Sequence, residues 1–445
     1  MPSDDPTELP ALGAATAAAR IREGRLSPVT LLDALLTRIR ALEPRLEAWV
    51  HVDEAGARAA AAALEAEARG GTIRGPLHGV PVGVKDIFHV AGMPTRAGSR
   101  PFAHSVPAVD ATSVARLRAA GAVVVGKTHT TEFAFRDPAP TRNPWNREHT
   151  PGGSSSGSAA AVAARMIPLA LGSQTVGSVL RPAAYCGVVG LKPTHGLVPV
   201  DGVIPLAWSL DHVGVFARSV ADAALALAVM AARPVAVEPV RAPRLALAPE
   251  LIARAEADVA AQVSAAVTAF ARSGATVTEV KLPPSFAGLH EAGLRVLEAE
   301  AGAYHEASLR EHRADYGASI RALADTGLGH SAAVYIRANR ARLAFRDDVL
   351  PLLAGYDALI SPTAPATAPA GLRWTGDASL CAPWSGSGMP SISLPTGLDR
   401  GGLPHAVQLV AAAGAESRLV SVAAWCEALL AFAATPPLAF RPCSI

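Results

Sequence analysis

The sequence predicts a single large α/β domain in which a twisted mixed β-sheet lies between layers of helices. Two observations support this fold class. Short β-branched segments alternate with helical segments along most of the chain, which is typical of a sheet covered by helices on both sides. The chain also has 445 residues, half of them apolar, which is enough to bury the core of such a domain.

Helices are expected to dominate residues 1–74. In the stretch SPVTLLDALLTRIRALEP, Ser27 stands at the position of a helix N-cap, Pro28 stands at the first helical position, and apolar residues recur at helical spacing. A second helix is expected in DEAGARAAAAALEAEARGG, where the final pair of glycines ends it.

Strands and helices alternate over residues 75–232, which we expect to form the catalytic core. Strands are expected in GVPVGVKDIF and AVVVGKT, helices are expected in ATSVARLRAAG and SAAAVAARM, and IPLALGSQT continues the alternation. The apolar run AALALAVMAA is half the length that a membrane span requires, so it is interpreted as a buried helix.

Residues 233–445 are expected to complete the sheet and to supply helices that line the substrate pocket. The Pro- and Val-rich stretch from Ala232 to Pro249 is interpreted as a loop that enters a strand, with a domain junction as the alternative. Residues 282–350 are expected to be mainly helical. Short strands are expected in DALISPTAP, MPSISLPTG and PHAVQLVA, followed by a closing helix in ESRLVSVAAWCEALLAF.

Composition and charge exclude several classes of protein. The formal net charge is only +2 and the charged residues are scattered, so neither nucleic acid nor a membrane is expected as a partner. The opening residues MPSDDPTELP lack the features of a signal or transit peptide, which predicts a cytoplasmic protein. The cysteines form no C-x-x-C pair and are expected to be free and mostly buried thiols; they are Cys186, Cys381, Cys426 and Cys443.

Lysine is rare in this chain. Among 40 basic residues, only Lys85, Lys127, Lys192 and Lys281 are lysines. A buried lysine can lose its proton whereas an arginine cannot, so each lysine is a candidate for a special role, with chance survival as the alternative. Lys85 lies in an apolar strand, where desolvation would favour the neutral amine that acts as a general base. A purely structural ion pair with the adjacent Asp86 is the alternative for Lys85.

The stretch TPGGSSSGSAA at residues 150–160 is rich in glycine and serine. It is too short and too embedded to be a linker, and no phosphate-binding motif accompanies it. A second such turn, GSQTVGS, runs from Gly172 to Ser178. With a lysine as base, two such turns could supply a serine nucleophile and an oxyanion hole of backbone N–H groups. Helix capping by the serines is the structural alternative.

Together these segments resemble the amidase signature family. Its motifs are a turn GGSS-(G/S)-G-S, a second turn G-(S/T)-D-T-x-G-S, a tail G-x-x-G-x-KPT, and an upstream G-(V/I)-P-x-x-(V/I)-KD that holds the catalytic lysine. This chain carries them in the family's order, and AAGAVVVGKTHTTEFA, PTRNPW and GMPSISLPTG extend the likeness over most of its length. The resemblance implies the amidase signature fold, with residues 1–445 as one domain.

By position, the resemblance implies a catalytic triad. Lys85 matches the base, Ser178 matches the nucleophile, and Ser154 matches the bridging serine, 24 positions before Ser178 as in the family. The peptide bond from Gly153 to Ser154 is cis in the family, and Ser155 matches a supporting serine. The resemblance also implies an oxyanion hole formed by the backbone N–H groups of Thr175, Val176, Gly177 and Ser178.

Two positions depart from the family pattern. Gln174 stands where an aspartate is common, and Leu180 stands where an arginine is common, with Arg181 one place later. We expect that a neutral hydrogen bond from Gln174 replaces a supporting ion pair. A Gln174 side chain that faces solvent is the alternative.

The expected function is hydrolysis of the C–N bond of a small carboxamide-like substrate through an acyl-serine intermediate, without a metal or an organic cofactor. A homodimer is compatible with the sequence. Two alternatives stay open within the family, namely a urea-derivative (allophanate or biuret type) or carbamate hydrolase, and the glutaminase subunit of a tRNA-dependent amidotransferase. The altered turn at Gln174 and Arg181 argues against the glutaminase. The lining from about residue 300 to residue 383 is expected to set the substrate.

Three further hypotheses fit the residues less well. A binding protein without activity would not need an intact triad. A Ser-His-Asp triad could use His212 beside Asp211, but no G-x-S-x-G motif is present. His305 and His312 lack the spacing of a zinc motif.

Overall fold

The computed structural model describes residues 8–438. Most of the acidic opening segment and Cys443 therefore lie outside the described residues. Within this range every helix is too short or too polar to cross a lipid bilayer. Cys186, Cys381 and Cys426 are free and buried, as the sequence predicts.

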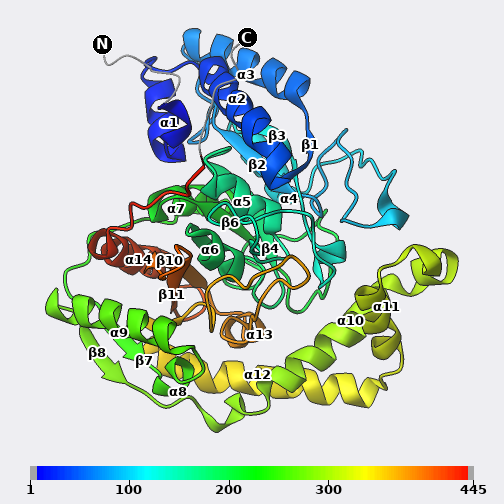
Figure 1. Cartoon of the computed structure of the whole chain (residues 1–445), viewed down its shortest axis with the longest axis vertical. Helices are drawn as coiled ribbons and strands as arrows, with labels where there is room; N and C mark the ends of the chain where they lie inside the picture. Colours follow the sequence, from blue (N-terminus) through cyan, green and yellow to red (C-terminus); the bar gives the residue numbers. More distant parts are fainter. Residues whose placement is uncertain (1–7, 439–445) are drawn as a thin grey trace.

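A mixed sheet of 11 strands runs through the molecule (Figure 1). In spatial order the strands are β1 (Trp49–Val52), β3 (Val123–Thr128), β2 (Pro81–Lys85), β4 (Leu169–Gln174), β6 (His212–Ala217), β5 (Val189–Lys192), β10 (Ser391–Leu398), β11 (Pro404–Val410), β9 (Ala358–Pro362), β7 (Arg244–Leu247) and β8 (Thr276–Glu279). The parallel pairs are grouped as β3–β2–β4 and as β9–β7–β8, and the consecutive pairs from β4 to β9 are antiparallel. The predicted mixed sheet is confirmed.

Helices cover both faces of this sheet. The α-helices of the described chain are α1 (Ala14–Arg22), α2 (Pro28–Leu46), α3 (Glu54–Arg69), α4 (Thr112–Ala119), α5 (Ser156–Ala163), α6 (Leu180–Cys186), α7 (Val220–Ala231), α8 (Pro249–Ile252), α9 (Ala257–Arg272), α10 (Leu289–His312), α11 (Ala318–Leu328), α12 (Ala332–Ala354), α13 (Ala382–Gly386) and α14 (Glu416–Leu430). Short 3₁₀ turns occur at Leu9–Ala11, Arg100–Phe102, Glu132–Ala134, Pro284–Phe286 and Arg313–Asp315.

The two-residue period of the strands divides the apolar side chains between two cores. In β3, Val124 packs in a core that also contains side chains of α4, α7 and α14. Val123 and Val125 pack on the opposite face with side chains of α2, α3 and α5. Burying a valine in this way stabilises the fold by roughly 1.5–3 kcal/mol. The sheet therefore lies between helical layers, as the sequence predicts.

The segments expected from the sequence occur where they were expected. GVPVGVKDIF contains β2, AVVVGKT contains β3, IPLALGSQT contains β4, and AALALAVMAA forms part of α7. The stretch from Ala232 leads by a loop into β7, which joins the same sheet, so it is not a domain junction. Residues 282–350 contain α10, α11 and most of α12. In Figure 1, α12 runs from the side of β7 and α8 toward α10 and α11, which lie at the right of the view.

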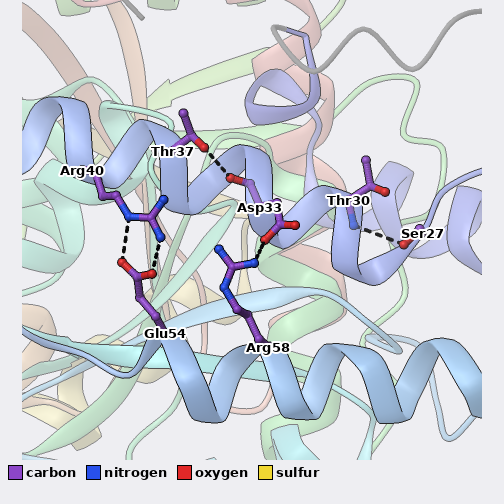
Figure 2. Close-up of polar contacts among 7 residues, drawn as sticks. All are labelled: Ser27, Thr30, Asp33, Thr37, Arg40, Glu54 and Arg58. Carbon is purple, nitrogen blue, oxygen red and sulfur yellow. Dashed lines mark hydrogen bonds and ion pairs between the residues drawn. The ribbon is translucent and has the colours of Figure 1, made fainter. Parts of the chain in front are cut away.

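The predicted cap of α2 is confirmed. Ser27 Oγ accepts a hydrogen bond from the backbone N–H of Thr30 at 3.1 Å, and Pro28 is the first helical residue (Figure 2). This bond satisfies one of the N–H groups that a helix leaves unpaired at its start.

Two ion pairs join α2 to α3, as Figure 2 shows: Arg40 with Glu54, and Asp33 with Arg58. All four side chains are substantially exposed, so each pair contributes at most about 1 kcal/mol. The shared apolar core, not these pairs, holds the two helices on the sheet.

Three of the four lysines are completely buried, and only Lys281 is exposed. Lys127 in β3 donates hydrogen bonds to Asp86 Oδ1 at 2.8 Å, to Thr95 Oγ1 at 2.9 Å and to the carbonyl of Pro94 at 3.0 Å. This buried ion pair ties β3 to the loop that follows β2. The ion pair proposed as an alternative for Lys85 is wrong, because Asp86 pairs with Lys127 instead.

We expect Lys127→Ala to lower the free energy of unfolding by about 3–5 kcal/mol, because it leaves the Asp86 carboxylate buried without its cationic partner. The matched control is Lys281→Ala at an exposed position, which should change it by less than about 0.5 kcal/mol. Chemical denaturation of the three proteins checks both values. Equal stability of Lys127→Ala and the parent would contradict this account of the ion pair.

Candidate active site

Two parallel strands bring the candidate residues together at one edge of the sheet. Lys85 is the last residue of β2, and Ser173 and Gln174 end β4. The register aligns Val84 with Leu171, so the carboxyl ends of the two strands lie side by side. Ser154 and Ser155 directly precede α5, which packs on these strands.

The amine of Lys85 is surrounded by hydroxyl groups. Its Nζ lies 2.7 Å from Ser154 Oγ and 2.8 Å from Ser173 Oγ. The side chain is completely buried, and among residues 8–438 no carboxylate forms an ion pair with it. Burial lowers the pKa of Lys85 well below its usual range, and only the more distant Asp211 opposes this shift. The environment therefore favours the neutral amine.

The Gly153–Ser154 peptide bond is cis. Arg181 reaches it from α6, where its Nη2 donates to the Gly153 carbonyl at 2.5 Å and its Nη1 donates to the Gly376 carbonyl at 2.6 Å. The arginine that stands one place later than the family pattern thus still binds the serine turn.

Ser155 joins the two serine turns. Its Oγ lies 3.3 Å from both the backbone nitrogen and the carbonyl oxygen of Ser173. The side chain is completely buried. Ser155 therefore helps to hold Ser173, which in turn contacts Lys85.

Ser178 lies at the end of the second turn, with 8% of its surface exposed. In the described part of the chain, no hydrogen bond joins its hydroxyl to Ser154, and the backbone N–H groups of Val176, Gly177 and Ser178 donate none. These three N–H groups are free to bind an oxyanion. The structure forms the Lys85–Ser154 contact of the expected triad but not the Ser154–Ser178 contact.

Gln174 does not face solvent, because its side chain is completely buried. Its Oε1 accepts hydrogen bonds from the backbone N–H groups of Val179 and Leu180 at 2.8 and 2.9 Å, at the start of α6. Its Nε2 donates to Ser385 Oγ at 2.9 Å, and Ser385 Oγ donates to the carbonyl of Val176 at 2.8 Å. The neutral amide of Gln174 therefore holds the start of α6 directly and holds the carbonyl of Val176 through Ser385.

The sequence analysis missed a role for Asp211 beside this turn. Thr175 Oγ1 donates to Asp211 Oδ1 at 2.5 Å, and Asp211 Oδ2 accepts from the backbone N–H groups of Leu206 and Ala207. Burial raises the pKa of Asp211 to about 6. The only signal in the sequence was an aspartate inside an apolar segment. Ser173 was also missed, although it lies within the quoted motif GSQTVGS.

The structure does not support the alternatives that involve histidines, namely a Ser-His-Asp triad at His212 and a zinc motif at His305. His212 Nδ1 lies 2.6 Å from the Leu210 carbonyl and 3.1 Å from the Gln174 carbonyl, and not against a serine or Asp211. His305 is buried and lies 3.1 Å from the hydroxyl of Tyr316. A Ser-His-Asp triad at His212 is therefore excluded by these contacts.

Two adjoining cavities open beside the candidate site. The inner cavity contacts Ser173, Thr175 and Asp211. The outer cavity shares Asp211 with it and extends to Trp208 and Tyr304. Most of the other lining residues lie between positions 200 and 213, outside the range that the sequence analysis expected to set the substrate.

Comparisons with known proteins show which proteins this chain is similar to. A sequence model of the family described as Amidase matches residues 30–420. A glutamyl-tRNA(Gln) amidotransferase subunit of Roseiflexus castenholzii is 36% identical, over 94% of this chain and 95% of its own. The solved structure of peptide amidase from Stenotrophomonas maltophilia is 34% identical, with a TM-score of 0.82 over 95% of this chain and 98% of that one.

A further solved structure comes from a protein complex that bears on the evolutionary origins of an s-triazine catabolic enzyme. Its chain is 30% identical to this one, with a TM-score of 0.87 over 96% of this chain and 100% of that one.

We expect Gln174→Ala to lower the free energy of unfolding by about 1–3 kcal/mol, because it leaves buried N–H groups at the start of α6 without an acceptor. The same change should lower kcat, since the turn that carries Ser178 loses its anchor. Ser385→Ala removes the contact to Nε2 and the hydrogen bond to the Val176 carbonyl, but it leaves both hydrogen bonds at the start of α6 in place, so it should have a smaller effect on both quantities. Thermal unfolding and amide hydrolysis measure them, and an unchanged Gln174→Ala protein would contradict the anchoring role.

Proposed function

This chain belongs to the amidase signature family, and from that premise we propose that it hydrolyses the C–N bond of a small carboxamide through an acyl-enzyme on Ser178. The observation that carries the proposal is the contact between Lys85 Nζ and Ser154 Oγ at 2.7 Å, made by a buried amine that has no ion pair among the described residues. A neutral amine in contact with a hydroxyl can accept its proton.

The proposed reaction begins when Ser178 Oγ attacks the carbonyl carbon of the substrate. Ser154 accepts the proton of Ser178 and passes its own proton to neutral Lys85. The N–H groups of the turn from Thr175 to Ser178 bind the oxyanion that forms. The relay then returns a proton to the departing nitrogen as the C–N bond breaks, and water releases the acyl group by the same route.

In this proposal, the hydrogen bond between Ser154 and Ser178 forms when the substrate binds. Catalytic hydrogen bonds are often loose in a free enzyme and tighten when substrate binds. Gly153, Ser155, Gln174 and Arg181 act as positioning residues, and the relay needs neither a metal nor an organic cofactor.

The cavities favour an apolar amide substrate. Valine, isoleucine, leucine and aromatic side chains line the two cavities beside Asp201 and Asp211, and no lysine or arginine of the described chain lines either cavity. A substrate carboxylate would therefore enter without a cationic partner. We place the enzyme in the cytoplasm, acting on a small molecule, and a homodimer is compatible with this proposal.

A second candidate is the glutaminase component of a tRNA-dependent amidotransferase. It is favoured by the 36% identity to one subunit of such an enzyme over nearly the whole chain. The missing cation in the cavity lining argues against it, because free glutamine carries a carboxylate. A hydrolase of urea derivatives or carbamates is the third candidate, and it would use the same triad.

A fluorophosphonate reagent should label Ser178 and no other residue. Ser178→Ala and Lys85→Arg should both lose the label and lower kcat/KM by ~10³-fold or more, because arginine cannot accept a proton. The control Ser264→Ala changes an exposed serine of α9 and should behave as the parent. Peptide mass mapping locates the label, and a label on another residue would overturn the assignment of Ser178.

A panel of substrates separates the three candidate functions. We expect aryl or aliphatic carboxamides to give a kcat/KM at least ~10-fold above that of L-glutamine, because the cavity offers the glutamine carboxylate no cation. The rate of ammonia release gives kcat/KM for every substrate in the same assay. Preference for glutamine would establish the glutaminase instead, and preference for biuret or a carbamate would establish the third candidate.

A further inference from the structure

A cluster of three metal-ligating side chains lies outside the candidate active site. Asp258 is in the first turn of α9, Asp399 follows β10, and His405 lies in β11. One ligand atom from each residue lies within 4.8 Å of the ligand atoms of the other two. The fold therefore brings Asp258 to two residues that lie far from it in the sequence.

The environment of the His405 side chain points to a bound ligand. Its side chain is only 5% exposed, and neither ring nitrogen has a hydrogen-bond partner among residues 8–438. Its Nε2 lies 3.4 Å from Asp258 Oδ2 without forming a hydrogen bond. Buried polar groups are almost always paired, and a buried imidazole without a hydrogen-bond partner is costly.

Both carboxylates are held in orientation by their own neighbours. Asp399 Oδ1 accepts a hydrogen bond from the backbone N–H of Leu403 at 2.8 Å, and its Oδ2 accepts from Thr367 Oγ1 at 2.9 Å. Asp258 Oδ1 accepts from the backbone N–H of Val259, which leaves Oδ2 on the side of His405. Metal-ligating carboxylates are typically supported by such hydrogen bonds.

We propose that Asp258, Asp399 and His405 bind one divalent transition-metal ion, of the Zn²⁺ type. Zinc binds histidine nitrogen and carboxylate oxygen at about 2.0–2.2 Å in a tetrahedral arrangement, which separates neighbouring ligand atoms by roughly 3.3–3.6 Å. The 3.4 Å between His405 Nε2 and Asp258 Oδ2 meets this requirement. An imidazole in the ligand set favours a transition metal over Mg²⁺ or Ca²⁺. The ion would join α9 to the β10–β11 hairpin.

The test is a titration of the full-length, chelator-treated protein with Zn²⁺ in competition with a metallochromic dye. We expect one ion per chain, and at least tenfold weaker binding in both His405→Ala and Asp258→Asn. The second variant changes a half-exposed carboxylate and tests the site without disturbing the core. The matched control is His290→Ala at an exposed position, which should bind Zn²⁺ as tightly as the parent.

Two further measurements distinguish coordination from a structural effect. Zn²⁺ should raise the melting temperature of the parent and of His290→Ala, and should not raise that of the two site variants. Labelling of Ser178 by the fluorophosphonate should be unchanged in all of these proteins. A failure of the proposed metal site can therefore be told apart from a failure of the proposed hydrolysis. The metal site is overturned if the parent binds no Zn²⁺ below ~100 µM, or if either site variant binds within tenfold of the parent.

Discussion

The candidate active site depends on one constraint, the burial of the Lys85 amine away from water at the end of β2. Three lysines are completely buried, and their partners differ in kind. Lys127 has the carboxylate of Asp86 and is held as half of an ion pair. Lys192 contacts the backbone carbonyls of Met389 and Pro193, and burial lowers its pKa to about 7. Lys85 alone contacts two hydroxyl groups, and a hydroxyl can give up a proton where a carbonyl cannot. The same burial therefore produces a structural amine in one case and a candidate base in another.

The sheet topology turns this local chemistry into a site. Because β2 and β4 are parallel neighbours, the residues that end them share one edge. The second serine turn follows β4 at that edge, and the first serine turn directly precedes α5. Side chains then fix the turns from opposite sides: Arg181 binds the carbonyl of Gly153, and Gln174 binds the backbone at the start of α6. Both of these positioning side chains are buried, so the two turns are anchored from inside the protein.

The local sequence pattern was enough to predict most of the helices and strands around the site, because helix caps, the spacing of apolar residues and terminal glycines can be recognised within a few residues. The resemblance to a known family supplied the candidate triad. What the sequence could not give is the identity of partners that meet across the fold. Asp86 follows Lys85 in the chain, yet it lies in the loop after β2 and pairs with Lys127 in the neighbouring strand β3. Asp211 and Ser385 were missed for the same reason, because only tertiary packing brings them to the turn.

The neutral amide at position 174 fits the electrostatics of a lysine base. Asp211 is already a buried acidic group that favours the charged form of Lys85, and its effect opposes that of desolvation. A second carboxylate in the turn after β4 would add to this opposition and stabilise the protonated amine. Gln174 supplies the two hydrogen bonds that the start of α6 needs without adding a negative charge. Where a carboxylate is common in the family, this chain keeps the anchor and omits the charge, which leaves desolvation as the dominant influence on Lys85.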